Sequence, residues 1–341
     1  MRIAVVNDSP AAVNAIENIV GSVPKYEIAW TAGNGAEAVK GCKADRPDLI
    51  LMNLVMPVMD GAEATRLIMK NTPCSILVVT STVEGNRSKV FEAMGHGALD
   101  VVTTPDLGPR GETEGAEELL DKIAVIGKLI GKAAETRRRT PGKKKKLAAV
   151  IHDIPPLVII GSSTGGPKAL SEILSELPEK FGAAVAIIQH VNAEYTAGMA
   201  EWLGQQCPLP VALAVDGAYL EAGKVLLAAT DDHLIIKPDL TLKYTSEPRE
   251  YNYRPSVDIF FRSIEKNWPE CAAAVLLTGM GSDGARGLLA LRKAGWYTIA
   301  QDKKSSIVYG MPKAAAELGA AVDILPVDRI VPALVSFFDK A

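Results

Sequence analysis

The sequence predicts two α/β domains, each built on a mostly parallel, doubly wound sheet with helices on both faces. Up to residue 132, five short apolar runs rich in β-branched residues alternate with five segments of helical periodicity. The alternation resumes after residue 153, beyond a strongly basic stretch. Such alternation is typical of parallel sheets, whose strands are buried on both faces.

The first half is predicted to form a five-stranded, flavodoxin-like domain over residues 1–125. In such a sheet the chemistry lies at the carboxyl ends of the strands. The expected strands are Ile3–Val6, Ile28–Thr31, Leu49–Met52, Ile76–Val79 and Val101–Val102, and the expected helices are Ala11–Val20, Ala36–Cys42, Gly61–Lys70, Arg87–Met94 and Glu117–Lys132.

Residues 126–152 are predicted to form a helical extension and a basic linker. Within Arg137–Lys146, seven cations repel one another and cannot bury a face. Pro141-Gly142 also prevents a continuous helix. Binding to anionic lipid or nucleic acid is the alternative, but the rest of the chain offers no support for it.

The second half, residues 153–341, is predicted to be a larger and mostly parallel α/β domain. Three closely spaced strands have no helices between them, which indicates a short antiparallel excursion. The expected strands are Leu157–Ile160, Ala184–Ile188, Val225–Ala228, Leu234–Lys237, Leu242–Tyr244, Ala273–Leu277, Thr298–Ala300 and Val322–Ile324.

Composition and charge exclude several classes of protein. The 341 residues are 48% hydrophobic and 23% charged, with a net charge of -3 that gives no sign of nucleic-acid binding. No apolar run approaches the roughly 20 residues of a membrane span, and the N-terminus lacks a signal-peptide pattern. The cysteines are scattered without a Cys-x-x-Cys pair, so we expect no metal site and no disulfides, and a cytoplasmic protein. They are Cys42, Cys74, Cys207 and Cys271.

A strand that runs into a Gly-rich turn carries the first candidate catalytic residue. Gly161, Ser163 and Gly165 fit the G-x-S-x-G pattern, in which a sharp turn exposes the serine hydroxyl above the sheet. The following helix would offer its amides to a developing negative charge. Cradling of a phosphate by the same glycines is the alternative.

A serine nucleophile needs a base and an orienting acid. Of the four histidines, His190 follows the strand over 184–189, whereas His96, His152 and His233 lie elsewhere. Asp283 follows another strand and a Gly-rich turn, although it could instead cap the next helix. The order Ser, His, Asp differs from the Ser, Asp, His order of α/β-hydrolases.

Four segments resemble the signature segments of the CheB family of protein-glutamate methylesterases. They are Gly161–Gly166, Gln189-His190, Arg254–Asp258 and Leu277–Gly284. The resemblance implies hydrolysis of glutamate γ-methyl esters on the cytoplasmic helices of methyl-accepting chemoreceptors, together with deamidation of receptor glutamines.

The resemblance to the CheB family also implies roles for individual residues. Ser163 would attack the ester, His190 would transfer the proton and Asp283 would orient His190. Backbone amides near Ser163, at Thr164 and Met280, would form the oxyanion hole, although Met280 could equally be a packing residue. No cofactor is implied.

The first half resembles a response-regulator receiver whose phosphorylation site is altered. The resemblance rests on the segments Val6–Ser9 and Pro47–Gly61. A working receiver needs an aspartate acceptor and acidic residues that hold Mg²⁺. The altered and remaining positions are Asn53 at the acceptor, Asn7 and Asp8 on the first strand, Thr104 at the usual lysine, and Thr80 at the usual hydroxyl residue.

These substitutions predict a pseudo-receiver without a metal ion. Asn53 alone could be an engineered change, and ordinary polar strand ends of an unrelated domain are a second alternative. Met59–Thr65 and Met94–Asp100 further suggest a branch that serves a pathway other than flagellar chemotaxis, such as surface sensing of the Wsp type.

Three functions compete at this stage. The first is an active receptor methylesterase. The second is a non-catalytic module that binds receptors or a chemosensory histidine kinase, and the third is a hydrolase of small esters. The complete Ser, His, Asp set favours an enzyme, and the fused receiver-like domain favours a protein substrate.

Overall fold

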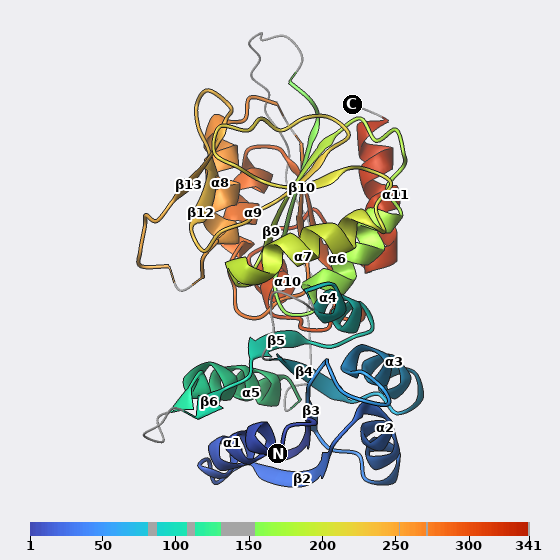
Figure 1. Cartoon of the computed structure of the whole chain (residues 1–341). Helices are drawn as coiled ribbons and strands as arrows, with labels where there is room; N and C mark the ends of the chain where they lie inside the picture. The colour runs from blue at the N-terminus through green and yellow to red at the C-terminus, as the bar shows by residue number, and fades with distance from the viewer. Residues whose placement is uncertain (81–86, 108–112, 131–153, 252, 271, 340–341) are drawn as a thin grey trace. The chain divides into compact units, whose positions relative to one another are not determined.

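A computed structural model describes residues 1–80, 87–107, 113–130, 154–251, 253–270 and 272–339 (Figure 1). The chain divides into two compact units, Met1–Thr136 and Arg137–Ala341.

The first unit is a five-stranded parallel sheet with the strand order β2-β1-β3-β4-β5. Helices α1 and α5 contact each other, and so do α2, α3 and α4 in turn, so the sheet is covered on both faces. The elements are β1 (Arg2–Val6), α1 (Pro10–Gly21), β2 (Glu27–Ala32), α2 (Gly35–Ala44), β3 (Leu49–Met52), α3 (Gly61–Asn71), β4 (Ser75–Thr80), α4 (Arg87–Gly95), β5 (Asp100–Thr103) and α5 (Ala116–Ile130).

Local sequence explains where three of these helices begin. The side chains of Ser9, Asn34 and Asp60 each accept a hydrogen bond from the first turn of the helix that follows. All five predicted strands and helices of this unit are confirmed, although the last two residues of the helix expected over 117–132 lie outside the described residues. A small antiparallel pair, β6 (Asp106–Leu107) and β7 (Thr113–Glu114), was not predicted.

The second unit is built on a seven-stranded parallel sheet with the order β10-β11-β9-β8-β14-β15-β16. A separate antiparallel pair, β12 and β13, lies outside it. The strands are β8 (Leu157–Ser162), β9 (Ala184–Gln189), β10 (Val211–Leu213), β11 (Val225–Leu227), β12 (His233–Ile236), β13 (Leu242–Thr245), β14 (Ala273–Leu276), β15 (Tyr297–Gln301) and β16 (Asp323–Leu325).

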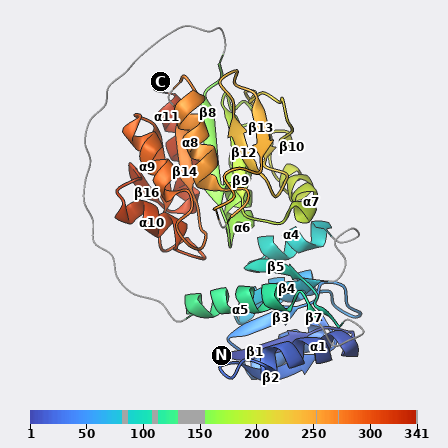
Figure 2. The same cartoon turned by 90° about the vertical axis from the view of Figure 1, so that its left-hand side faces the viewer.

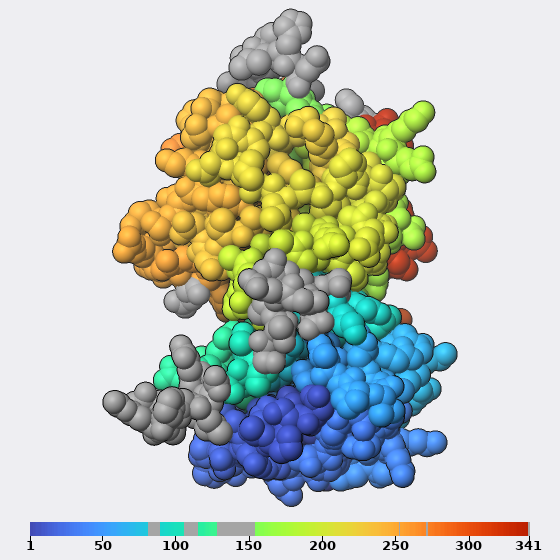
Figure 3. Space-filling view, viewed as in Figure 1, coloured from blue at the N-terminus to red at the C-terminus, as the bar shows by residue number. Residues whose placement is uncertain are grey.

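Helices cover both faces of this sheet. In Figure 1, α8 and α9 lie to the left of the sheet, α6 and α11 lie to its right, and α7 runs across the front of its lower part. Helix α6 contacts both α7 and α11. The segment from α7 to β13 makes up much of the visible face of this unit (Figure 3). The helices are α6 (Gly166–Ser175), α7 (Ala193–Gly204), α8 (Val257–Asn267), α9 (Ala285–Lys293), α10 (Met311–Glu317) and α11 (Val327–Phe338).

The predicted short antiparallel excursion is confirmed, but it is smaller than expected and leaves out β11. Only β12 and β13 pair in this way, whereas β11 pairs in parallel with both β9 and β10. Leu227 is completely buried, as is typical of a strand inside a doubly covered sheet. The edge strand β10 was missed because it has three residues, none of them buried.

Sheet order determines where functional residues can meet. Strand β8 is central, with β9 on one side and β14 on the other. The carboxyl ends of these parallel strands therefore lie next to one another at one edge of the sheet (Figure 2).

Across the described ranges, no helix is long and apolar enough to cross a membrane. Cys42, Cys74 and Cys207 are free thiols, and Cys271 is outside the described residues. Burial raises the pKa of Cys74 to about 12, so this thiol stays protonated at neutral pH.

The basic linker over 137–146 lies outside the described residues, so its exposure stays a prediction. We expect trypsin to cut the native protein first within this stretch and to release two folded fragments. Mass spectrometry of a limited digest would locate the first cut. If 137–146 stayed intact while other sites were cut, the domain boundary would be misplaced.

Candidate active site

The turn between β8 and α6 carries Ser163. The backbone N–H of Ser163 donates to Thr278 O at 3.0 Å, which ties this turn to the segment after β14. Gly165 has a φ of +76°, a left-handed conformation that favours glycine and allows α6 to begin directly after the turn. Ser163 lies in the predicted strand–turn–helix setting, with 8% of its surface exposed.

Strand register places His190 beside this turn. Ser162 pairs with Gln189 across β8 and β9, and His190 N donates to Ser162 O at 3.0 Å. The side chain of His190 is 9% exposed. The histidine and the serine thus follow paired positions on neighbouring strands.

Asp283 accepts a hydrogen bond from His190 Nε2 at 2.9 Å through its Oδ2 atom. The same carboxylate also accepts hydrogen bonds from Val257 N, Asp258 N and Ser256 Oγ, at 2.7, 3.0 and 2.8 Å. Each carboxylate oxygen therefore accepts two bonds, which uses the acceptor capacity of the group. Asp283 caps a helix, as the sequence suggested, but the helix is α8 rather than the following α9.

These hydrogen bonds determine the charge of Asp283. Burial alone would raise its pKa, but the bonds from His190, Asp258 and Ser256 outweigh burial, and the pKa lies below its ordinary value. Asp283 is therefore a carboxylate at neutral pH. A fixed carboxylate on Nε2 holds the proton of a neutral imidazole on that nitrogen.

Asp258 caps helix α9, just as Asp283 caps helix α8. It lies in the first turn of α8, and its Oδ1 accepts a hydrogen bond from Gly287 N in the first turn of α9. Burial raises the pKa of Asp258, and the charge of Asp283 adds to this effect. Asp283, which precedes the N-cap of α9, thus caps α8, and Asp258 in the first turn of α8 caps α9 in return.

The other ring nitrogen of His190 is free. Nδ1 is buried and has no hydrogen-bond partner, and the described residues contain no hydrogen bond between Ser163 and His190. Of the two contacts that the proposed roles require, the one between Asp283 and His190 is present, and the one between His190 and Ser163 is absent. Nδ1 is the nitrogen that can receive a proton, since Nε2 is bound to Asp283.

The segment after β14 packs against Ser163. A Cβ on Gly279 would lie 2.8 Å from the Ser163 Cβ and 2.2 Å from the Met311 sulfur, so only glycine fits at this position. In the described part of the chain, the backbone amides of Thr164 and Met280 donate no hydrogen bond. Both amides therefore remain available to an oxyanion beside Ser163.

Gln189 is a buried residue to which the sequence assigned no role. Its Nε2 donates to Ser163 O at 2.9 Å and to His190 O at 3.0 Å, and its Oε1 accepts from Ser162 Oγ at 2.6 Å. Gln189 is 2% exposed. A polar residue at the end of a wholly apolar strand was the signal that could have identified it.

Among the described residues, His190 is the one histidine that is hydrogen-bonded to Asp283. His233 is completely buried, accepts a hydrogen bond from Ser256 N through Nδ1, and contacts Pro248 O through Nε2. Burial lowers the pKa of His233, so this ring is neutral. His96 faces Glu92 in the first unit, and His152 lies outside the described residues.

In the first unit, Asn53 occupies the end of β3. Its Nδ2 donates to Asp8 Oδ1 at 3.1 Å and to Val55 O, and its Oδ1 accepts from Leu54 N. Asn7 Oδ1 accepts a hydrogen bond from Ser9 N at 2.9 Å. The amide of Asn53 therefore presents N–H groups to the one acid of this site.

The two threonines predicted for this site also lie at strand ends. The carbonyl of Thr80, which is 1% exposed, accepts a hydrogen bond from Thr104 N. The Thr104 hydroxyl is buried without a partner. The residues that the structure describes include no group of three or more acidic, histidine or cysteine side chains that could hold a metal ion.

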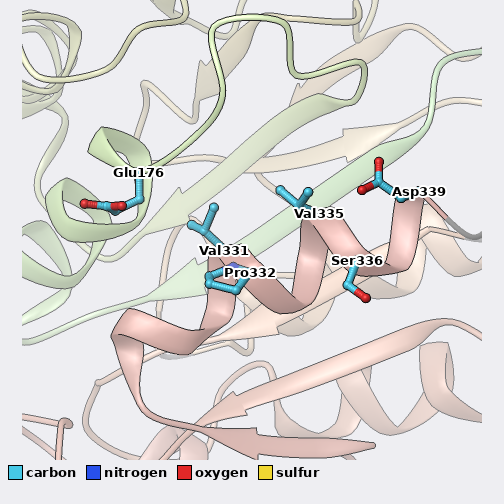
Figure 4. Close-up of a pocket in the computed structure, with 6 residues that line it drawn as sticks. All are labelled: Glu176, Val331, Pro332, Val335, Ser336 and Asp339. Atoms are coloured by element: carbon cyan, nitrogen blue, oxygen red, sulfur yellow. The ribbon is translucent and has the colours of Figure 1, made fainter.

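A pocket of about 450 Å³ lies between the C-terminal end of α6 and helix α11 (Figure 4). Glu176, at the end of α6, lines one side of this pocket, and its carboxylate points away from α11. The α11 residues that line it are Val331, Pro332, Val335, Ser336 and Asp339. None of the candidate catalytic residues contributes to it.

Comparisons with known proteins agree with both units. Residues 158–334 match the family model of the CheB methylesterase, and residues 3–106 match that of the response regulator receiver domain. The protein-glutamate methylesterase/protein-glutamine glutaminase 1 of Bordetella avium is 52% identical over 338 residues, which cover 99% of this chain and 97% of that protein.

Two further similarities are of the same kind. A protein-glutamate methylesterase/protein-glutamine glutaminase of Mesorhizobium japonicum is 51% identical over 332 residues, covering 97% of this chain and 96% of that protein. The crystal structure of the Thermotoga maritima CheB methylesterase catalytic domain is 34% identical, with a TM-score of 0.52. It covers 54% of this chain and 100% of that chain.

The buried amide of Gln189 leads to a test of the site's framework. We expect Gln189→Leu to destabilise the second unit by about 2–3 kcal/mol, because it leaves the His190 carbonyl without its donor and the Ser162 hydroxyl without its acceptor. The Ser163 carbonyl would keep its bond from Gly166 N. Urea unfolding followed by tryptophan fluorescence would measure the change. The matched control is Gln205→Leu, at an exposed residue, which should change the free energy of unfolding by less than about 0.5 kcal/mol. Equal effects of the two substitutions would contradict the role of Gln189.

Proposed function

The chain belongs to the CheB family of protein-glutamate methylesterases/protein-glutamine glutaminases, and we propose that Ser163, His190 and Asp283 carry its hydrolytic chemistry. The enzyme removes methyl groups from glutamate γ-methyl esters of chemoreceptors and deamidates glutamines, in chemotaxis adaptation. The contact between Asp283 and His190, one strand away from the Ser163 turn, is the observation that carries the proposal.

The first half of the proposed reaction forms an acyl-enzyme. The Ser163 oxygen attacks the ester carbonyl, and its proton passes to His190 Nδ1. The tetrahedral intermediate then collapses, the bond to the methoxy oxygen breaks, and that oxygen takes the proton from His190 and leaves as methanol. A rotation of the Ser163 side chain toward Nδ1 completes the contact that the free protein lacks.

The second half of the reaction regenerates the enzyme. Water attacks the acyl carbonyl, gives a proton to His190 Nδ1, and the Ser163 oxygen leaves with that proton. The product is a glutamate side chain. A glutamine substrate follows the same steps with ammonia as the leaving group, which accounts for both activities with one set of residues.

Asp283 and two backbone amides would stabilise the charges that develop. Asp283 holds Nε2–H throughout and favours the imidazolium that forms when His190 takes the proton. The free amides of Thr164 and Met280 would bind the oxyanion. A single donor of this kind is worth about 10²–10³-fold in rate.

Substitution of the three side chains tests the catalytic assignment. We expect Ser163→Ala and His190→Ala each to reduce methanol release from methylated receptor membranes by about 10⁴-fold or more. Asp283→Asn should reduce the rate of methanol release by a smaller factor, because the orientation of His190 contributes only part of the rate enhancement. Ser175→Ala, at the other end of α6, is the control and should keep full activity.

The same assay separates the competing functions. Activity of Ser163→Ala within tenfold of the unaltered enzyme would overturn the assignment. A protein that releases no methanol from receptors but cleaves small activated esters would instead be a small-ester hydrolase.

We also propose that the first unit is a pseudo-receiver. The residues present do not fit a receiver's Mg²⁺ site, because Asn53 directs an N–H group at Asp8 and Asn7 uses its oxygen on Ser9 N. Mg²⁺ requires oxygen ligands, and the amide of Asn53 cannot form an acyl phosphate at a useful rate. Thr104 supplies no cation to meet a phosphate.

A receiver that cannot be phosphorylated has no signal that shifts it between two states, so the methylesterase activity should be constant. We propose that the first unit restrains the methylesterase at a low basal activity and docks partners, among them a chemosensory histidine kinase. We further propose that the protein works in the cytoplasm, in a Wsp-type pathway. The proposed boundaries are 1–125 for the pseudo-receiver, 126–152 for the linker and 153–341 for the methylesterase domain.

Deletion of residues 1–146 tests the proposed restraint. We expect the shortened protein to release methanol faster than the full chain, and acetyl phosphate to leave the full chain unchanged. Phosphorylation with activation would refute the pseudo-receiver. A response gained by Asn53→Asp alone would mean that only the acceptor position has been lost.

A further inference from the structure

A tyrosine covers one face of the proposed catalytic base. The rings of Tyr253 and His190 are stacked with their centroids 4.6 Å apart and their planes within 3° of parallel. Tyr253 lies in the connection between β13 and α8 and is 38% exposed, whereas the His190 side chain is 9% exposed. The tyrosine therefore lies between the histidine and solvent.

The same tyrosine reaches the segment that carries a free amide. A Cβ on Gly281 would lie 3.2 Å from the Tyr253 hydroxyl oxygen, so this oxygen is close to the Gly281 backbone. Gly281 has a φ of +78° and directly follows Met280. Tyr253 thus contacts the base on one side and the proposed oxyanion turn on the other.

The chain on both sides of Tyr253 is held in place by His233. Nε2 of His233 is 3.1 Å from Pro248 O, and Nδ1 accepts a hydrogen bond from Ser256 N. Ser256 in turn donates to Asp283. The connection that carries Tyr253 is therefore anchored before and after the tyrosine, and one anchor is shared with the orienting acid.

The histidine needs such support because hydrogen bonding alone does not fix its plane. The bond from Nε2 to Asp283 holds one edge of the ring, while Nδ1 has no partner. The ring can then tilt about that one contact and move Nδ1 out of its buried position. A parallel aromatic ring on one face opposes the tilt, excludes water, and stabilises positive charge on the imidazole.

We propose that Tyr253 is a positioning residue for His190, which acts through the face of its ring rather than through its hydroxyl. The inference rests on the proposed catalytic role of His190. The hydroxyl of Tyr253 makes no hydrogen bond to the described residues. The near-parallel stack is thus the contact through which Tyr253 can act on the base.

Two substitutions in the full-length protein separate the ring from the hydroxyl. Tyr253→Phe keeps the ring and should retain methanol release within about twofold. Tyr253→Leu keeps apolar bulk without a flat ring and should lower kcat about tenfold with little change in KM. The control is Tyr219→Leu. Tyr219 is 57% exposed and lines a pocket that contains none of the proposed catalytic residues, so this variant should match the unaltered enzyme.

Labelling of Ser163 by a fluorophosphonate provides a second readout. The serine oxygen forms a bond to phosphorus, fluoride leaves, and the serine proton goes to His190. Its rate depends on the base but not on binding of the receptor. We expect Tyr253→Leu to slow labelling by the same factor as kcat, and Tyr253→Phe to leave it unchanged.

The outcomes are distinguishable. Full activity of Tyr253→Leu, or an equal loss in Tyr253→Phe, would overturn the role of the ring face. A rise in KM with unchanged kcat and labelling would identify a substrate contact and overturn positioning. Retained activity of Ser163→Ala would instead refute the catalytic assignment on which the inference rests.

Discussion

The arrangement of the catalytic unit depends on the carboxylate of Asp283. Its two oxygens accept bonds from an imidazole, a hydroxyl and two backbone amides at the start of α8. Removing any one donor would leave a buried charge less well compensated, which costs more than the bond itself contributes. The position of His190 is therefore determined by the same contacts that begin helix α8, and folding and the proposed catalysis share one set of hydrogen bonds.

The register of the sheet determines where Ser163 lies relative to His190. The paired positions of β8 and β9 bring Ser163 and His190 to adjacent strand ends, and the buried amide of Gln189 bonds to the backbone of both. Backbone pairing of this kind fixes positions without using the reactive side chains. Nδ1 of His190 has no partner among the described residues, which leaves it free for the proton transfer proposed above.

The sequence predicted those parts of the molecule that follow from local periodicity and strand ends. Every strand of the five-stranded sheet of the first unit was predicted in this way. The proposed catalytic residues Ser163, His190 and Asp283 were selected because each follows a strand, Asp283 after a Gly-rich turn. The direction of β11 was not predictable, since hydrophobic runs do not reveal which neighbour a strand pairs with. Likewise, Tyr253 and the caps of α8 and α9 depend on contacts between segments distant in sequence.

The exchanged caps of Asp258 and Asp283 join the first turns of α8 and α9 into one cooperative element. Fraying of the α8 turn removes the acceptor of Gly287 N, and displacement of the segment before α9 removes the acceptor of the α8 amides, so the two should open together in a single sub-global fluctuation. Such an opening would release the imidazole while the seven-stranded sheet stayed intact. On heating, the enzyme would then lose activity in a local transition that precedes the melting of its core.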